Sequence, residues 1–172
     1  MHPEIEILAP GNLSSDEFQT CLALLEQGNA VDVEYARKEL PRAVCIALRR
    51  DAGEIVALGA VKRIRPNYAA DKADRAGFQF DSNIHEVGYI VVRESHRDKK
   101  LSRPILEALL ASFDSRPLFA TTFNERMMTS LGRCGFEKKG KKWQNPKGDW
   151  LSLWIMTTLA KSVDASQPTP AA

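Results

Sequence analysis

Apolar residues recur along this chain at two spacings, and each spacing predicts one kind of secondary structure. Short apolar runs, continuous or alternating with polar residues, predict strands. The seven predicted strands cover residues 4–9, 43–50, 54–65, 85–92, 118–123, 136–143 and 150–157. Apolar residues three and four positions apart predict helices. The four predicted helices run from Ser14 or Ser15 to Gly28, through Tyr35 and Leu40, from Ser102 through Leu110, and from Asn124 to Gly135.

Two segments lack a clear apolar period. Residues 66–82 are polar and are predicted to form a long loop, and long ordered loops are often functional. Residues 161–172 are rich in Ser, Pro and Ala, and we expect a disordered tail there. One domain is therefore predicted over residues 1–160. The order of its elements predicts an α/β (α+β mixed sheet) class, with an antiparallel first half and crossovers later.

Composition narrows the functional classes only slightly. The 172 residues carry a formal net charge of +2, which by itself does not argue for a nucleic-acid partner. The amino terminus lacks the basic and apolar segments of a signal peptide, and no apolar run is long enough to cross a bilayer. We therefore expect no membrane partner. The three cysteines are widely spaced and form no CxxC, so we expect a cytoplasmic protein without disulfides. The three histidines have no ligand-like spacing, so we expect no metal.

The central stretch combines a strand, a basic turn and the start of a helix. The strand covers residues 85–92, and Ser102 is expected to cap the helix, with Pro104 in its first turn. A helix amino terminus presents unpaired backbone N–H groups and the positive end of the helix dipole. The turn and first helical residues add four basic side chains, Arg97, Lys99, Lys100 and Arg103. This combination predicts a site for a phosphate-bearing cofactor.

With these residues in place, the chain resembles the GNAT superfamily of acyl-CoA N-acyltransferases over residues 4–157. The hexapeptide Arg97-Asp98-Lys99-Lys100-Leu101-Ser102 stands where the family has a Q/R-x-x-G-x-G/A pyrophosphate loop. Asn124 heads a helix that ends in Gly135-Phe136, as is common in the family, and the order of elements also agrees. The resemblance implies a GNAT-like fold, a central mixed β-sheet flanked by helices. It also implies transfer of an acetyl group from acetyl-CoA to an amine.

The resemblance also implies how coenzyme A is held and where this chain departs from the family. The diphosphate would lie in the basic loop, and the pantetheine arm would pair with the preceding strand. The implied cofactor contacts are Ile90, Val91, Val92, Arg97, Asp98, Lys99, Lys100, Leu101, Ser102, Arg103 and Asn124. Lys100 replaces the first family glycine, and we expect it to hold helical geometry. Leu131 replaces the tyrosine that many members use to protonate the leaving thiolate.

Two residues of the central strand are candidates for proton transfer. Glu86 stands about as far before the loop as the base glutamate of histone-acetylating relatives, so the resemblance implies that it is the general base that deprotonates the acceptor ammonium. Tyr89 is the substitute acid. The structural alternatives are a surface carboxylate near a strand end for Glu86 and a packed core side chain for Tyr89. A bulge at Gly88 would expose a backbone N–H for the oxygen of the thioester carbonyl.

The acceptor is expected to be a small-molecule or peptide amine that the sequence does not name, and a homodimer is compatible with the chain. Two other functions stay open. The altered loop and Leu131 fit a catalytically weak acyl-CoA-binding or regulatory protein on the same fold. A predicted hairpin carries Lys138, Lys139, Lys141 and Lys142. These lysines are typical of a protected edge strand, and they also fit a nucleic-acid-binding module, which we rank below the transferase.

Overall fold

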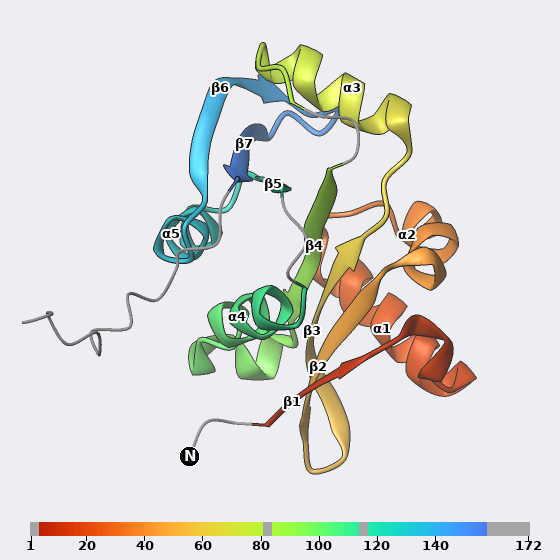
Figure 1. The fold of residues 1–172 in the computed structure, drawn as a ribbon. Helices are drawn as coiled ribbons and strands as arrows, with labels where there is room; N and C mark the ends of the chain where they lie inside the picture. The colour runs from red at the N-terminus through yellow and green to blue at the C-terminus, as the bar shows by residue number, and fades with distance from the viewer. Residues whose placement is uncertain (1–3, 81–83, 114–116, 158–172) are drawn as a thin grey trace, which may run out of the picture.

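The computed structural model describes residues 4–80, 84–113 and 117–157. They form a seven-stranded sheet in the order β1-β2-β3-β4-β5-β7-β6, with helices on both faces (Figure 1). The strands are β1 (Ile5–Leu8), β2 (Cys45–Asp51), β3 (Glu54–Lys62), β4 (His85–Val92), β5 (Leu118–Thr122), β6 (Glu137–Gln144) and β7 (Trp150–Met156). The helices are α1 (Ser15–Gly28), α2 (Val33–Glu39), α3 (Pro66–Ala76), α4 (Ser102–Ser112) and α5 (Glu125–Arg133). Three short 3-10 helices are η1 (Pro10–Asn12), η2 (Leu40–Arg42) and η3 (Glu94–Lys99).

The sheet is mixed, as predicted. Strands β1 to β4 pair antiparallel, β4 and β5 pair in parallel, and β5, β7 and β6 pair antiparallel again. The antiparallel first half and the later crossover are therefore confirmed. Figure 1 shows the β5-β7-β6 group set apart from β1, β2 and β3, with β4 between the two groups.

Each face of the sheet buries its own apolar layer, because successive strand residues point to opposite faces. On one face, Ile105 and Leu109 of α4 pack in a cluster with Val87 of β4. On the other face, Leu25 of α1 packs in a cluster with Leu58 of β3. Figure 1 shows α4 and α5 on one side of the strands and α1 and α2 on the other. The two faces of β4 therefore meet different helices, since Val87 belongs to the first cluster and Tyr89 to the second.

Gly59 sets how closely α4 approaches the sheet. A Cβ atom at this position would lie 2.6 Å from Cγ2 of Ile105 and 3.0 Å from Cδ1 of Leu109. Both contacts are shorter than van der Waals packing allows, and the atoms belong to fully buried side chains. The glycine in the middle of β3 is therefore explained by the close packing of α4, since a larger residue would push the helix away.

Local capping explains where two of the predicted helices begin. The Ser14 hydroxyl accepts a hydrogen bond from the Glu17 backbone N–H, and the Ser14 N–H donates to the Glu17 carboxylate. This reciprocal pair gives hydrogen-bond acceptors to two backbone N–H groups that have no partner within the helix. The Asn124 side-chain oxygen accepts from the N–H groups of Arg126 and Met127 at the start of α5. Both predicted starts are confirmed.

The prediction of a long loop over residues 66–82 is wrong, because α3 occupies most of it. The buried residues of α3 are Ala69, Ala73 and Ala76, which follow helical spacing but give a weak apolar signal. Pro66 starts the helix, and Gly77 ends it at a φ of 63°. The predicted tail, residues 161–172, lies outside the described residues.

Candidate active site

Strand β4 carries a bulge in its middle. Its register with β3 runs from Lys62 opposite Glu86 to Ala60 opposite Gly88, then resumes with Leu58 opposite Val91. Tyr89 has a φ of 54°, in the left-handed region that non-glycine residues seldom adopt. The bulge was predicted at Gly88, so the distorted residue lies one position later.

Gly88 has a different role, which is to make space. A Cβ atom there would lie 3.0 Å from Cε and 3.2 Å from Nζ of Lys62. The glycine therefore lets the Lys62 side chain lie across β4 at the bulge. Since its φ is not positive, conformational freedom is not the reason for a glycine here.

Strands β4 and β5 separate soon after they meet. They are paired only at His85 with Leu118 and at Glu86 with Phe119. Within the described residues, β4 beyond Glu86 has no strand partner on its β5 side. The predicted pantetheine contacts Ile90, Val91 and Val92 lie in this unpaired part. Their backbone is available to an extended ligand, and a ligand that pairs there would extend the sheet as a strand does.

The basic loop after β4 folds as η3 followed by a left-handed residue. Lys100 has a φ of 53° and a ψ of 40°, so the expectation that it holds right-handed helical geometry is wrong. Glycine adopts this conformation without strain, whereas a lysine does so at a cost of about 1 kcal/mol. Leu101 stands before the first turn of α4, with no side-chain cap, and Ser102 is the first helical residue. The predicted Ser102 cap is therefore wrong, and no side chain caps the first N–H groups of α4.

The side chains of this loop divide into paired and unpaired groups. Asp51, the last residue of β2, accepts from Lys99 Nζ at 3.5 Å and lies 2.8 Å from His96 Nε2. The hydrogen bond with His96, then the Lys99 charge, lowers the pKa of Asp51. Arg103 donates to Glu107 at 2.7 Å. Within the described part of the chain, the exposed Arg97 and Lys100 make no such pair, so they are the cations best placed to meet an anion.

Three further predicted contacts have defined surroundings. Asp98 is exposed, whereas Leu101 is 6% exposed and packs in the α4 core cluster. Asn124 uses its side-chain oxygen to cap α5, so its amide NH₂ is the part left for a ligand. Leu131 is 1% exposed within the same core cluster, and it presents no polar group to β4.

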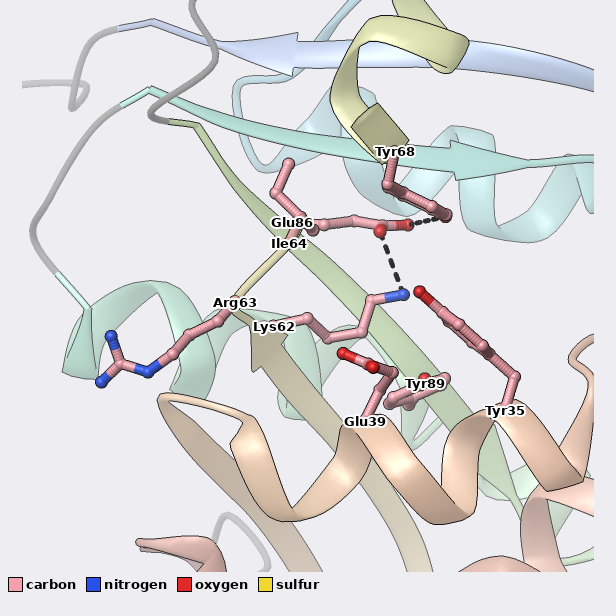
Figure 2. Close-up of a pocket in the computed structure, with 8 residues that line it drawn as sticks. All are labelled: Tyr35, Glu39, Lys62, Arg63, Ile64, Tyr68, Glu86 and Tyr89. Atoms are coloured by element: carbon pink, nitrogen blue, oxygen red, sulfur yellow. Dashed lines mark hydrogen bonds and ion pairs between the residues drawn. The ribbon is translucent and has the colours of Figure 1, made fainter. Parts of the chain in front are cut away.

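A hollow lies on the face of the sheet that α1 and α2 cover, beside the point where β4 and β5 begin to separate. Figure 2 shows its lining, which comes from α2, the end of β3, α3 and β4. The lining residues are Tyr35, Glu39, Lys62, Arg63, Ile64, Tyr68, Glu86 and Tyr89. In Figure 2 the side chains of Lys62, Tyr68 and Glu86 point toward one another, whereas Arg63 points away. The sequence placed only Glu86 and Tyr89 in this site.

Glu86 lies at the centre of this hollow and is 4% exposed. Tyr68 donates a long hydrogen bond, 3.4 Å, from its hydroxyl to Oε1 of Glu86. Lys62 Nζ lies 3.0 Å from Oε2 of Glu86, within ion-pair distance but without hydrogen-bond geometry. We therefore regard this contact as an ion pair that leaves Oε2 able to accept a hydrogen bond. The prediction of a surface carboxylate, which was the structural alternative, does not fit this burial.

Two tyrosines surround the ion pair. Lys62 Nζ lies 4.3 Å from the Tyr89 ring centroid and 5.9 Å from that of Tyr68, both within the range of cation–π attraction. Burial, then the negative charge of Glu86, raises the pKa of both Tyr68 and Tyr89. Both phenols are therefore protonated near neutral pH and act as hydrogen-bond donors rather than anions.

Glu39 forms the outer wall of the hollow and is held by two arginines. Its Oε2 accepts from Arg42 at 2.6 Å, and its Oε1 accepts from Arg65 at 2.9 Å. Glu39 is 8% exposed, so these partners offset the cost of burying its charge. The sequence missed Glu39, Lys62 and Tyr68. Only the Glu39–Arg42 spacing of three residues signalled a pair in advance.

The lysines of the predicted hairpin lie on β6, at the edge of the sheet. Three of the four, Lys138, Lys141 and Lys142, are exposed. Lysines at such an edge discourage pairing with another chain. In the described residues no helix is long and apolar enough to cross a membrane, and no cluster of three or more His, Cys, Asp or Glu side chains is arranged for a metal.

Comparison with known proteins gives a likeness in structure but not in sequence. No family model and no curated protein sequence matches this chain. The ribosomal-protein-S18-alanine N-acetyltransferase from Escherichia coli superposes with a TM-score of 0.64 at 11% identity, over 94% of this chain and 98% of that one. A GNAT-family acetyltransferase from Streptococcus agalactiae gives 0.62 at 13% identity, over 90% and 95%. The aminoglycoside 6'-acetyltransferase type Ii gives 0.59 at 15% identity, over 90% and 96%.

Proposed function

We propose, from the GNAT fold that this chain shares with its solved neighbours, that it moves an acetyl group from acetyl-CoA to an amine. The predicted GNAT-like fold class is confirmed, whereas the reaction is our proposal. One observation carries it. The unpaired part of β4 has a basic loop with a left-handed Lys100 at its carboxyl end and a buried carboxylate, Glu86, at its amino end. A ligand along this strand would reach from one to the other.

The donor side of the site fits coenzyme A. The left-handed Lys100 and the uncapped start of α4 leave backbone N–H groups for a diphosphate, and Arg97 and Lys100 supply charge without a competing partner among the described residues. The unpaired backbone of Ile90 and Val92 suits the amide groups of the pantetheine arm. Acetyl-CoA supplies the activated thioester. The bulge at Tyr89 offers a backbone N–H to the thioester oxygen.

The acceptor side offers a base and two neutral phenols. An ammonium must lose a proton before its nitrogen can attack a carbonyl carbon. Oε2 of Glu86 has capacity to accept that proton, since its contact with Lys62 lacks hydrogen-bond geometry. Solvent or Tyr89 is left to protonate the departing thiolate, because Leu131 is buried where many family members have a tyrosine. The raised pKa of Tyr89 makes it a weak proton donor, so we expect a modest rate of acetyl transfer.

The proposal is tested by thiol release from acetyl-CoA across a panel of small amines and short peptides. Wild type should release more than one thiol per protein chain only when an amine is added, and Glu86→Gln should show little of this amine-dependent release. Glu26→Gln, an exposed carboxylate on α1, is the matched control and should behave as wild type. Absence of release with every amine, together with saturable CoA binding, would favour the catalytically weak binding protein. The burial of Leu131 is the observation behind that second candidate.

A further inference from the structure

Lys62 places an amine of the protein itself inside the proposed acceptor site. It ends β3 directly opposite Glu86, and its side chain is only 14% exposed. Its Nζ lies 3.0 Å from Oε2 of Glu86 and 4.3 Å from the Tyr89 ring centroid. Figure 2 shows this side chain reaching across toward Glu86, between Tyr68 and Tyr89. An acceptor ammonium bound for transfer would need this same combination of a carboxylate and aromatic faces.

The Lys62 amine also lies against the bulge. Nζ is 3.2 Å from the point where a Cβ of Gly88 would stand, and Gly88 precedes the distorted Tyr89. The glycine leaves this space open for the lysine. In the proposed function, the backbone of this bulge orients the thioester carbonyl, so the Lys62 amine and the carbon that it would attack lie against neighbouring positions of β4.

Lys62 is held by charge and aromatic contacts, without a hydrogen bond. Among the described residues its Nζ makes none, and its ion pair with Glu86 lacks hydrogen-bond geometry. The side chain has four methylene groups and is free to shift by small rotations, since no donor–acceptor geometry fixes it. A nucleophile must be able to move toward its target in this way.

We infer that Lys62 is itself an acyl acceptor, so that the protein acetylates its own pocket. Glu86 takes a proton from the Lys62 ammonium, and the neutral Nζ attacks the thioester carbonyl carbon of acetyl-CoA. An N–C bond forms, the C–S bond breaks, and the CoA thiolate leaves and takes a proton from solvent. The second proton of Nζ is lost to solvent as the amide forms. The inference rests on the proposed function, because the same site must bind acetyl-CoA.

The test is a site-resolved measurement of acetylation. The purified full-length chain is incubated with isotopically labelled acetyl-CoA near neutral pH, and labelled peptides are mapped by mass spectrometry. Lys62 should carry the label before any exposed lysine does. Glu86→Gln should slow labelling of Lys62 by about 100-fold, the usual effect of losing a general base.

Lys72 is the matched internal control. It lies on α3, its Nζ is 4.7 Å from the Tyr68 ring centroid, and it pairs with Asp71 at 3.1 Å. Equal labelling of Lys62 and Lys72, or labelling that persists in Glu86→Gln, would show chemical acetylation and overturn the inference. An unlabelled Lys62 in a protein that acetylates external amines would overturn it while leaving the proposed function intact. Failure of the protein to bind CoA at all would remove both.

Discussion

The two ends of the unpaired part of β4 differ in how they are built: an exposed loop lies at the carboxyl end and a buried hollow at the amino end. The basic loop is exposed from Arg97 to Lys100 and relies on backbone conformation, with two cations that have no partner among the described residues. The hollow around Glu86 is buried and relies on side chains in contact with one another. A backbone site tolerates a change of residue as long as the conformation survives, which explains a lysine in a left-handed position. A buried side-chain site does not tolerate such changes, because each charge depends on its partner.

The largest effect should come from removing the proposed base. Glu86→Gln should lower kcat/KM about 100- to 10,000-fold, the range for a lost general base. The loss should be greatest at low pH, where the acceptor is an ammonium, and should narrow as pH approaches the pKa of the amine. A pH series of initial rates measures this, with Glu26→Gln as the control. Parallel profiles for wild type and Glu86→Gln would remove Glu86 from this role.

The next largest effect should be on stability and concerns the buried pair. Lys62→Met leaves Glu86 buried without its cation, and the free energy of unfolding should fall by about 3–5 kcal/mol. The double variant Lys62→Met/Glu86→Met replaces both charges by apolar groups and should recover most of that loss. Urea unfolding of the wild type, both single variants and the double variant completes the cycle. Additive losses in the double variant would show that the two residues do not depend on each other.

A smaller effect is expected in the basic loop. Lys100→Gly removes the strain of a lysine in the left-handed region but increases the conformational entropy of the unfolded chain. The free energy of unfolding should therefore rise by at most about 1 kcal/mol. Lys99→Gly, one position earlier and in η3, is the control and should destabilise the fold. Thermal unfolding of both variants measures the difference. A lower midpoint for Lys100→Gly than for wild type would contradict the importance of backbone conformation here.

The smallest effect should come from breaking the contact between Asp51 and the loop, and it should appear in how stability depends on pH. The pKa of Asp51 is lowered in the folded state, so its contribution is present at neutral pH and is lost as pH falls below its ordinary value of 3.8. Asp51→Asn should therefore lower the thermal midpoint slightly at neutral pH. Its midpoint should also fall less steeply than that of wild type as the pH is lowered. Thermal midpoints between neutral and acid pH test this. An unchanged acid slope would show that His96 and Lys99 do not stabilise the carboxylate.

The order of elements was predictable because strands and most helices keep their apolar period along the chain. Helix α3 was not, since its buried residues are alanines and its ends are marked only by Pro66 and Gly77. The basic loop was found because its cations are contiguous in sequence. The pairing of Glu86 with Lys62 was hidden, because it depends on the register of β3 with β4. The contact of Asp51 with the loop was hidden for a similar reason, because Asp51 ends β2, far from the loop in sequence. The roles of Glu86 and Tyr89 stay predictions.

The central claim is that the loop after β4 binds the diphosphate of coenzyme A. Calorimetric titration of CoA into wild type and into Arg97→Ala/Lys100→Gly tests it most directly, since the glycine keeps the left-handed conformation while removing the charge. Arg133→Ala, an exposed arginine at the far end of α5, is the control. Wild type and the control should bind equally, and the double variant should bind at least about tenfold more weakly, as expected for lost charge-assisted hydrogen bonds. No binding by wild type, or equal binding by the double variant, would contradict the account.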